Sequence, residues 1–387
     1  MRIGADIRTL MDENYSGVSL HNLNLIREIT RLDNENNYRL YYNSFKGADA
    51  DFPDLRKKNI KIIRGRYPNK LLNYALFKIF KRPRIDETLK ADIYFMPHIN
   101  FIALSGRAKS ILTIHDLSFL RHKEFFSIRK NIWHKFVNAR KLVRNFDRVV
   151  AVSESTKSDI VELCGIHESK VKVIYPGVGT EYRPLPENHP RLARIREKYG
   201  LPKKFILSLG TLEPRKNISG LIRAFDLLKK TASAGEPAED CELVIAGGEG
   251  WKAGKIFKEF SRAAHKKEIS FLSYVPENEK VYLYNLASVF AFPSFYEGFG
   301  FPPLEAMASG VPVVAGFSSS LPEVAGGAAL MVDPHDINDI KNGLRNALSD
   351  RELREKLSTR GLLRAKDFSW EKCAREYLWL FKEVWEK

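Results

Sequence analysis

Residues 288–310 have the sequence SVFAFPSFYEGFGFPPLEAMASG, the most informative stretch of this chain. The apolar run from Ser288 to Phe292 is typical of a buried strand, and it leads into a loop whose two glycines allow close backbone approach. The paired prolines suit the first turn of a short helix, which we predict from Pro303 to Ser309, with Gly310 closing it. A strand, a glycine loop and a helix N-terminus in this order predict a site that binds anions such as phosphate.

Two carboxylates flank this loop, Glu297 within it and Glu305 in the first helical turn. A helical Glu305 can accept hydrogen bonds from two adjacent hydroxyls, as a ribose presents them, while Glu297 lies where a sugar ring would meet the loop. The alternative is that Glu305 only caps the start of a helix. The glycines, the prolines and Glu297 would then each need a separate explanation, so the sequence favours a ligand site.

A second stretch, LGTLEPRKN at residues 209–217, follows the apolar run from Phe205 to Leu209 and precedes a helical pattern. Ligand sites of open parallel sheets lie at the carboxyl ends of the strands, which is where we predict Arg215 and Lys216. Two cations at that place could neutralise a diphosphate leaving group. A solvated Arg-Lys pair at the start of a helix is the alternative.

Short apolar runs alternate with helical patterns along the whole chain. The predicted strands are residues 3–7, 38–42, 60–63, 93–96, 111–114, 149–152, 171–175, 205–209, 243–246, 269–272, 289–292, 311–314 and 329–332, with helices for example at 132–143 and 155–163. This alternation predicts parallel βαβ units, hence an α/β fold with two Rossmann-like, doubly wound halves.

The domain organisation follows from a polar segment between the two series. This segment, Pro184 to Pro190, holds three prolines and is the expected linker. We therefore expect an N-terminal domain over residues 1–180 and a C-terminal domain over residues 181–369. An amphipathic pattern from Trp370 to Trp385 predicts a final helix outside the alternation.

Charge is spread unevenly along the 387 residues, whose formal net charge is +16. Residues 1–180 hold 32 Lys and Arg against 19 Asp and Glu, whereas residues 181–387 hold 31 against 28. A positive field of this kind attracts nucleic acid, anionic lipid headgroups or a substrate that carries a pyrophosphate. Solvated surface lysines are the other interpretation.

Several classes of protein fit the sequence poorly. No run approaches the ~18 consecutive apolar residues that cross a bilayer, and the chain opens without the apolar segment of a secretory signal. The three cysteines have no CxxC spacing, so we expect neither disulfides nor a zinc site. We therefore expect a cytoplasmic protein. A dehydrogenase would need GxGxxG after the first strand, Gly254-Lys255 lacks the P-loop pattern, and no DNA- or RNA-binding module is recognisable.

The two ligand stretches resemble the signature of the family 4 retaining glycosyltransferases, in which two Glu residues separated by seven others lie in the second domain of a GT-B fold. The resemblance extends to ILTIHDLS at 111–118, AVSES at 151–155, VIYPGV at 173–178 and LVIAGG at 243–248. It implies two Rossmann-like domains that face each other across a cleft, the first binding the acceptor and the second the nucleotide sugar. It also implies that the final helix, residues 370–387, joins the N-terminal domain.

Carried over residue by residue, the resemblance implies that Lys216 and Arg215 hold the donor diphosphate, that Glu305 holds the ribose and that Glu297 faces the transferred sugar. His115 would line the cleft near the anomeric carbon, although without the family context its position favours a structural histidine, and His98 is a weaker candidate on the acceptor side. The other positions implied in donor binding are Gly17, Gly210, Thr211, Gly248, Tyr274, Val275, Gly298, Phe299 and Gly300. Thr211 departs from the family, in which many relatives have arginine there, and Arg215 is the candidate to replace it.

Among family members, the motifs are most similar to the mannosyltransferases of bacterial surface polysaccharides. We therefore expect retaining transfer of mannose from GDP-mannose to a glycan or a polyprenyl-diphosphate-linked glycan, with no metal or other cofactor. The alternatives are a UDP-sugar-dependent glucosyl- or N-acetylhexosaminyltransferase and, from another class, a protein that binds polyanions or nucleic acid. The basic and aromatic residues from Phe119 to Trp133 suggest peripheral contact with an anionic membrane at its inner face. We expect no nucleic-acid partner.

Overall fold

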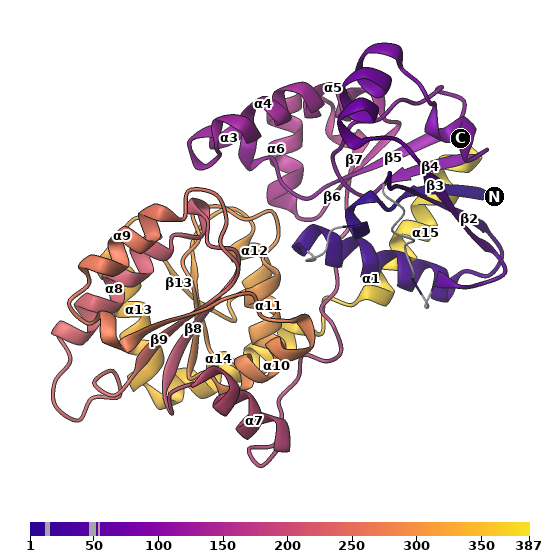
Figure 1. Ribbon diagram of the computed structural model, residues 1–387. Coiled ribbons are helices and arrows are strands. Elements are labelled where there is room, and N and C mark those ends of the chain that lie inside the picture. Colours follow the sequence, from indigo (N-terminus) through magenta and orange to yellow (C-terminus); the bar gives the residue numbers. More distant parts are fainter. Residues whose placement is uncertain (12–15, 46–51, 53–54) are drawn as a thin grey trace. The chain divides into compact units, whose positions relative to one another are not determined.

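The computed structural model describes residues 1–11, 16–45, 52 and 55–387, and it divides the chain into two compact units. The first unit comprises Met1–Leu117, Arg129–Gly177 and Ser369–Lys387, and the second comprises Ser118–Ile128 and Val178–Phe368. Figure 1 shows that each unit is built on its own sheet, with helices around it. The prediction of an α/β fold with two Rossmann-like halves is confirmed.

The first unit contains a seven-stranded sheet in the order β3-β2-β1-β4-β5-β6-β7, and its described pairings are all parallel. A parallel sheet is covered by helices on both faces, so its central strands need apolar residues on both sides. β4, for instance, is buried along its whole length. The strands are β1 (Arg2–Asp6), β2 (Asn37–Asn43), β3 (Ile60–Gly65), β4 (Ile93–Met96), β5 (Lys109–Ile114), β6 (Arg148–Ala151) and β7 (Val171–Val173).

The second unit contains a six-stranded sheet in the order β10-β9-β8-β11-β12-β13, again with parallel pairings among the described strands. Its strands are β8 (Phe205–Leu209), β9 (Glu242–Ala246), β10 (Ile269–Leu272), β11 (Val289–Phe292), β12 (Val313–Gly316) and β13 (Leu330–Val332). The strand predicted at 311–314 begins two residues later because Pro312 has no N–H for the ladder. The carbonyl of Pro312 still accepts a bond from Phe290.

Helices connect the strands of both sheets. Those up to β7 are η1 (Arg8–Met11), α1 (Gly17–Leu32), the π-helix η3 (Leu71–Phe80), α2 (Ile85–Thr88), α3 (Ser118–Arg121), η4 (Lys123–Phe125), α4 (Ile128–Val137), α5 (Ala139–Asn145), α6 (Glu154–Cys164) and η5 (Glu168–Lys170). Those that follow are α7 (Pro190–Tyr199), η6 (Pro214–Lys216), α8 (Ile218–Lys230), α9 (Gly254–Arg262), η7 (Lys266–Glu268), α10 (Glu277–Leu286), α11 (Phe301–Ala308), α12 (Leu321–Ala325), α13 (Ile337–Ser349), α14 (Arg351–Ala365) and α15 (Trp370–Glu386).

The helix predicted at 132–143 is two helices, α4 and α5. Asn138 separates them because its backbone is left-handed, with φ at 56°. Its side-chain oxygen accepts a hydrogen bond from the N–H of Lys141 at 3.1 Å and so caps α5. The apolar period continues across this junction, which is why the sequence pattern did not reveal the break.

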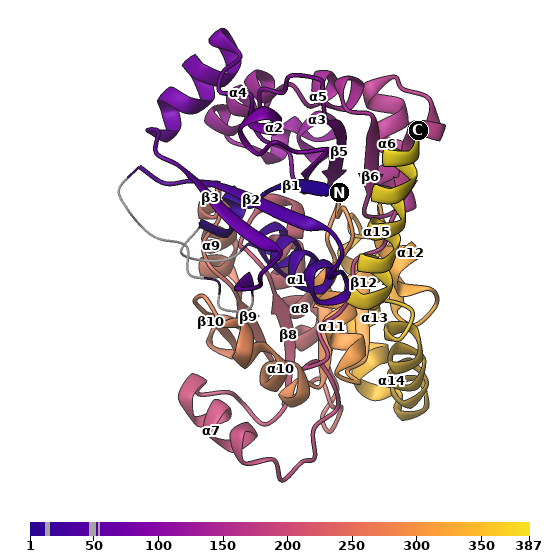
Figure 2. The same ribbon diagram turned by 90° about the vertical axis from the view of Figure 1, so that its right-hand side faces the viewer.

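The C-terminal helix α15 belongs to the first unit, where Figure 2 shows it beside α1. The hydroxyl of Tyr377 lies 2.8 Å from Thr113 Oγ1 of β5. The ring of Phe95 in β4 packs against Tyr377 and Phe381, with centroids 5.2 and 5.4 Å apart. The buried aromatic face of α15 therefore completes the core of the first unit.

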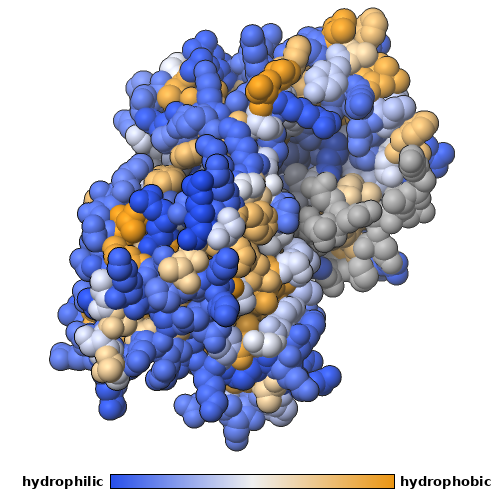
Figure 3. All heavy atoms as spheres, turned by 60° about the vertical axis from the view of Figure 1, so that its left-hand side comes forward, coloured by the Kyte–Doolittle hydropathy of each residue, from blue (hydrophilic) through white to orange (hydrophobic). Residues whose placement is uncertain are grey.

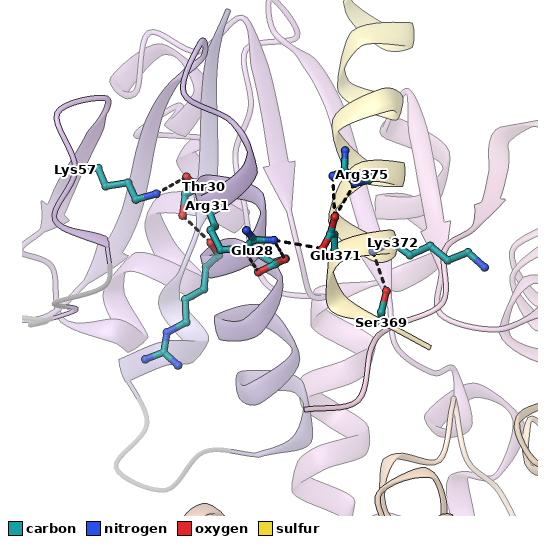
Figure 4. A network of polar contacts seen from close by, with 9 residues as sticks. Glu28, Thr30, Arg31, Lys57, Ser369, Glu371, Lys372 and Arg375 are labelled. Carbon is teal, nitrogen blue, oxygen red and sulfur yellow. Dashed lines mark hydrogen bonds and ion pairs between the residues drawn. The ribbon is translucent and has the colours of Figure 1, made fainter. Parts of the chain in front are cut away.

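Polar contacts between α1 and α15 lie at the edge of this core, as Figure 4 shows. Arg31 of α1 pairs with Glu28 at 2.7 Å and with Glu371 of α15 at 3.5 Å. Glu371 also pairs with Arg375 one turn along its own helix. Exposed ion pairs of this kind contribute only about 0–1 kcal/mol each to stability. Burial of the apolar side chains of α15 therefore provides most of the free energy that holds it in the first unit.

After the short excursion of Ser118–Ile128 into the second unit, the chain leaves the first unit again after Gly177 and returns to it at Ser369. A Cβ atom on Gly177 would lie 2.1 Å from the backbone nitrogen of Trp370, so only glycine fits beside the returning chain. The expected linker, residues 184–190, lies inside the second unit instead. Asn285 of α10 holds this part of the chain, because its side chain accepts a bond from the N–H of Leu185 and donates one to the carbonyl of Arg183.

Candidate functional site

Two loops at the carboxyl ends of β8 and β9 lie against each other. The N–H of Gly210 donates to the carbonyl of Ala246, and the N–H of Leu212 donates to the carbonyl of Gly248, both at 2.9 Å. A Cβ atom on Gly247, whose φ is +146°, would lie 2.0 Å from the Gly210 oxygen. The contact therefore excludes a side chain at residue 247, and it places three predicted donor-binding residues, Gly210, Thr211 and Gly248, on one edge of the sheet.

Arg215 and Lys216 follow the first of these loops, and Glu297 binds both of them. Arg215 Nη1 lies 2.6 Å from Glu297 Oε2, and Lys216 Nζ lies 2.7 Å from Glu297 Oε1. A second carboxylate, Glu213, lies 2.5 Å from Arg215 Nε. Two stretches about 80 residues apart in sequence thus form one cluster of two cations and two anions. The alternative of a solvated Arg-Lys pair is wrong, because Lys216 is only 8% exposed.

Burial and neighbouring charges set the protonation of this cluster. Burial lowers the pKa of Lys216, and Arg215 lowers it further, while Glu297 opposes the shift. Burial alone would raise the pKa of Glu297, but Arg215 and Lys216 hold it below its usual range. Lys216 Nζ also lies 4.6 Å from the centre of the Phe292 ring, an additional stabilising contact for the cation. Glu297 is therefore a carboxylate with a cation on each oxygen.

The loop that carries Glu297 is fixed by three serines after β12. Ser318 donates to the carbonyl of Ser294 at 2.8 Å, and the hydroxyl of Ser319 accepts from the N–H of Glu297 at 2.7 Å. Ser320 donates to the carbonyls of Glu297 and Phe299, at 3.0 and 2.7 Å. Sequence reasoning missed these serines, although the run Ser318-Ser319-Ser320 directly after an apolar strand is a visible signal.

Glu305 lies in α11, the helix that follows this loop in the chain, and belongs to a second polar cluster. Tyr284 donates its hydroxyl to Glu305 Oε2 at 2.7 Å. Nearby, Glu277 accepts from Tyr182 at 2.5 Å and from Lys280 at 2.6 Å. The alternative that Glu305 caps a helix is wrong, because Gly300 is the N-cap of α11 and the Glu305 side chain is bound by α10 instead. None of these partners was singled out from the sequence.

The pKa of Glu305 is raised to about 7, chiefly by burial. Lys280 lowers it, Glu277 and Glu181 raise it further, and the bond from Tyr284 favours the ionised form. The charge of Lys280 is itself stabilised by Glu305 and Glu277, against the effect of burial. Glu305 can thus change its charge near neutral pH, and Lys280 is the cation that favours the carboxylate.

The remaining predicted positions of the second unit surround these two clusters. Gly298, Phe299 and Gly300 are buried between Glu297 and the start of α11. Gly300 has a φ of +114°, and a Cβ atom there would lie 2.8 Å from Leu321, so this position needs glycine. Tyr274 and Val275 follow β10, the first 45% exposed and the second buried. An exposed ring beside a buried aliphatic residue can border a planar ligand.

His115 and Gly17 belong to the first unit. His115 follows β5, and its Nε2 lies 2.8 Å from the carbonyl of Pro97, so Nε2 carries the proton and Nδ1 can accept one. Burial lowers the pKa of His115, which keeps the ring neutral, and its edge packs against His21 with centroids 4.5 Å apart. Gly17 is exposed at the first turn of α1, next to the cap Ser16. Asn14 and Tyr15 of the predicted loop lie outside the described residues.

His98 is buried in the first unit, with 5% exposure. Burial lowers its pKa to about 4, and its Nε2 lies 3.3 Å from Asn100. The neighbouring ion pair of Arg8 and Asp6, 2.6 Å apart, is also buried. A neutral, enclosed ring of this kind fits a structural histidine.

Residues 118–128 belong to the second unit, not to the N-terminal domain expected over residues 1–180. The ring of Phe126 stacks on Trp251, and Trp251 Nε1 donates to the carbonyl of Phe125 at 2.7 Å. Phe125 stacks on Phe295 of the glycine loop. The rings of Phe119 and Phe126 are buried, so these two cannot contact lipid headgroups as the sequence suggested, whereas Lys123, Arg129 and Lys130 of the same stretch are exposed. Long-range packing removed the two rings from the surface.

Comparison with known proteins assigns the chain to a family. Residues 15–182 match the family described as Glycosyltransferase Family 4, and residues 193–364 match Glycosyl transferases group 1. O-antigen chain mannosyltransferase B of Escherichia coli is 33% identical over 300 residues, which cover 76% of this chain and 74% of the relative. The chain belongs to the family 4 glycosyltransferases.

This glycosyltransferase is also similar to the serotype-specific mannosyltransferase WbdA of Escherichia coli, at 32% identity over 274 residues. The match covers 69% of this chain and 32% of WbdA, so the chain spans about a third of that relative. Among solved structures, sucrose-phosphate synthase from Thermosynechococcus elongatus has a TM-score of 0.77 at 18% identity, with 100% and 99% of the two chains covered. Anabaena HepE in complex with UDP and glucose has a TM-score of 0.74 at 16% identity, with 99% and 100% covered. These neighbours show the GT-B fold.

Within the second unit of the glycosyltransferase, the structure brings together Arg215, Lys216 and Glu297. Glu305 lies in α11, which follows the loop that carries Glu297. Gly17 and His115 lie in the first unit. The described residues include no group of three or more His, Cys, Asp or Glu that could hold a metal ion. They also include no helix with the length and apolar character needed to cross a bilayer.

Proposed function

We propose that this glycosyltransferase transfers mannose from GDP-mannose to a hydroxyl of a glycan or polyprenyl-diphosphate-linked acceptor, with retention of anomeric configuration and without a metal ion. The observation that carries the proposal is the buried cluster in which Glu297 holds Arg215 and Lys216 at the carboxyl end of β8. Two fixed cations there can receive a diphosphate. The two Escherichia coli relatives named as mannosyltransferases support the choice of sugar.

The proposed mechanism rests on charge that develops as the glycosidic bond breaks. Negative charge grows on the departing diphosphate, and Lys216 and Arg215 bind it more tightly in the transition state than in the ground state. Because Glu297, Glu213 and the Phe292 ring already hold the two cations, little reorganisation accompanies the reaction. The backbone at Gly298 to Gly300, before the N-terminus of α11, would contact the sugar or phosphate.

Glu297 is proposed to position the reacting groups and not to attack the sugar. Both of its carboxylate oxygens are bound by cations at 2.6 and 2.7 Å, which lowers their nucleophilicity. The leaving diphosphate would then accept the proton of the acceptor hydroxyl on the same face of the sugar, which accounts for retention. His115, neutral with Nδ1 as an acceptor, would bind a hydroxyl of the sugar near the anomeric carbon.

At the nucleotide end, Glu305 is proposed to accept hydrogen bonds from the two ribose hydroxyls. Tyr284 occupies one lone pair of Oε2 and orients the carboxylate, which leaves acceptor capacity on both oxygens. Tyr274 and Val275 would border the base, and Gly210, Thr211 and Gly248 would form the neighbouring wall. A UDP-sugar donor is the second candidate, because the Anabaena neighbour was crystallised with UDP and glucose.

A nucleotide panel tests the donor. With EDTA present throughout, GDP at saturation should raise the melting temperature by about 5 °C, since ligand at 100 times its Kd contributes about 2.7 kcal/mol. UDP and ADP should raise it less. A larger shift with UDP would replace the proposed donor, loss of the GDP effect in EDTA would contradict metal independence, and stabilisation only by a long polyanion would favour a binding protein.

The affinity for GDP-mannose should depend on pH through Glu305, whose raised pKa leaves it partly protonated at neutral pH. Affinity should rise from pH 6 to pH 8 and then level off, because only the carboxylate accepts from both hydroxyls. Lys280→Met should move the midpoint to higher pH, since it removes the cation that favours ionisation. Titration calorimetry measures the affinity at each pH. Because the esterified diphosphate of GDP-mannose does not titrate between pH 6 and pH 8, the ligand itself adds no pH dependence.

Lys198→Met is the matched control. Lys198 is a half-exposed lysine of α7, and it pairs with Glu279 of α10, the helix that carries Lys280. Its profile should coincide with that of the unaltered protein. Identical midpoints for Lys280→Met and Lys198→Met would show that Lys280 does not set the charge of Glu305.

A further inference from the structure

Six exposed apolar side chains of the first unit lie on two helices. Figure 3 shows orange, apolar side chains among blue, hydrophilic ones in the upper part of its view, and α4 is labelled in the upper part of Figures 1 and 2. Ile79 and Phe80 of η3 are 70% and 65% exposed. The η3–α4 face consists of Leu71, Tyr74, Ile79, Phe80, Ile132 and Phe136.

The two helices of this face are in direct contact. The ring of Tyr74 meets that of Phe136 edge to face, with centroids 5.8 Å apart, and Lys78 Nζ donates to the carbonyl of Phe136 at 2.5 Å. Tyr74 also packs on Phe101, at 5.1 Å, and Phe101 packs on Trp133 of α4, at 6.0 Å. The two helices that carry the six apolar side chains therefore pack against each other.

The surroundings of the face are strongly basic. Residues 66–84 and 128–145, which contain η3, α4 and α5, hold twelve Lys and Arg and no Asp or Glu. Lys70, Lys81, Arg82, Lys135 and Lys141 are exposed. Burial, Lys81 and Lys141 all lower the pKa of Lys78, which shows how closely the positive charges gather around the helix junction.

We propose that the η3–α4 face docks on an anionic lipid membrane. Apolar side chains that rise from a basic surface are the arrangement by which peripheral helices enter a headgroup layer, the rings and aliphatic chains inserting while the cations meet lipid phosphates. A second copy of the chain would bring two positive faces together, which like-charge repulsion opposes. A nucleic acid would satisfy the charges but leave the apolar side chains in water.

This inference goes beyond the proposed donor chemistry and centres the membrane contact on η3 and α4, where Ile132 is the one residue of the η3–α4 face that lies within the stretch Phe119 to Trp133 suggested by the sequence. It deepens the proposed acceptor class, since a polyprenyl-diphosphate-linked glycan is displayed at a lipid surface. It rests on the proposed function only in that respect. The surface itself is defined by exposure and charge, whichever sugar is transferred.

Vesicle flotation tests the proposal. At low salt the protein should float with vesicles that contain about 30% phosphatidylglycerol and not with pure phosphatidylcholine, and about 0.5 M NaCl should release it. The double variant Ile79→Ser, Phe80→Ser should lower the partition coefficient at least about tenfold by removing the inserting groups. Lys81→Glu, Arg82→Glu should lower it by a similar factor by reversing charge.

Matched controls change the same chemistry in the second unit. Phe317→Ser, Leu363→Ser removes two exposed apolar side chains, and Lys266→Glu, Lys267→Glu makes the same change in net charge. Both should float like the unaltered protein. All variants should keep the melting shift with GDP, which separates failure at the membrane from failure of the proposed function or of folding.

Other outcomes would overturn the proposal. The face does not dock on lipid if the protein stays unbound by anionic vesicles, or if the η3 variants float as well as the controls. A dimer in sedimentation velocity that Ile79→Ser, Phe80→Ser dissociates would assign the face to a second copy. Binding to a DNA duplex that is tighter than to vesicles, and weakened by charge reversal alone, would assign it to nucleic acid.

Discussion

Lys216→Met should lower kcat/KM for the sugar nucleotide by about three orders of magnitude, because removal of one preorganised donor to a developing anion costs about 10²–10³ in rate. The loss of the cation also leaves Glu297 and Glu213 with Arg215 as their common partner. We therefore expect a destabilisation of about 3 kcal/mol, as for a broken buried ion pair. Initial rates and thermal melting separate the two effects.

Two further variants sharpen this expectation. Lys216→Arg keeps the charge but replaces a compact ammonium by a wide planar group, so it should recover stability more fully than activity. Lys204→Met changes an exposed lysine just before β8, at the opposite end of the strand from Lys216, and should leave both quantities unchanged. Activity of Lys216→Met within tenfold of the unaltered enzyme would refute the assigned role.

Glu305→Gln should weaken nucleotide binding on the order of 100-fold, because hydrogen bonds to a charged group contribute about 1.5–3 kcal/mol each. The amide has nearly the same size and can still accept from Tyr284, so the second cluster should stay folded. Since the pKa of Glu305 is raised in the folded state, ionisation lowers stability as pH rises through about 7. The variant should therefore be at least as stable as the unaltered protein at pH 8.

Calorimetry with GDP and melting curves at pH 6 and pH 8 measure both expectations. Glu279→Gln is the matched control, because Glu279 lies on α10 but pairs with Lys198 and Tyr199. It should bind GDP normally. Unchanged affinity in Glu305→Gln would refute ribose binding by Glu305, whereas weaker binding together with a lower melting temperature at pH 8 would point to disturbed packing.

Much of the fold could be predicted from sequence because it depends on local patterns. β4, β8, β10 and β11 begin and end at the residues that the apolar runs predicted. A strand covered on both faces is a nearly continuous apolar run, so the ends of the run predict the ends of the strand. The break at Asn138 was missed, because a left-handed residue interrupts a helix without interrupting its apolar period.

The candidate site was predictable only in part. Arg215, Lys216, Glu297 and Glu305 could be named because each lies beside glycines or prolines at the end of a strand, where a ligand is expected. That Glu297 binds both cations could not be foreseen, since a backbone pattern does not fix which side chains meet. Lys280 and Tyr284 lie within α10, a helix without glycine or proline at a strand end, and nothing in its sequence marks them as neighbours of Glu305.

Two parallel sheets and the candidate ligand positions at their strand ends follow from local sequence, because apolar periodicity and turn residues act over a few neighbouring positions. The charge partners of Glu297 and Glu305, the burial of Phe119 and Phe126, and the exposure of Ile79 and Phe80 are visible in the folded chain alone. These depend on which distant segments pack together. An apolar residue gives the same sequence pattern whether another segment covers it or it stays exposed to solvent.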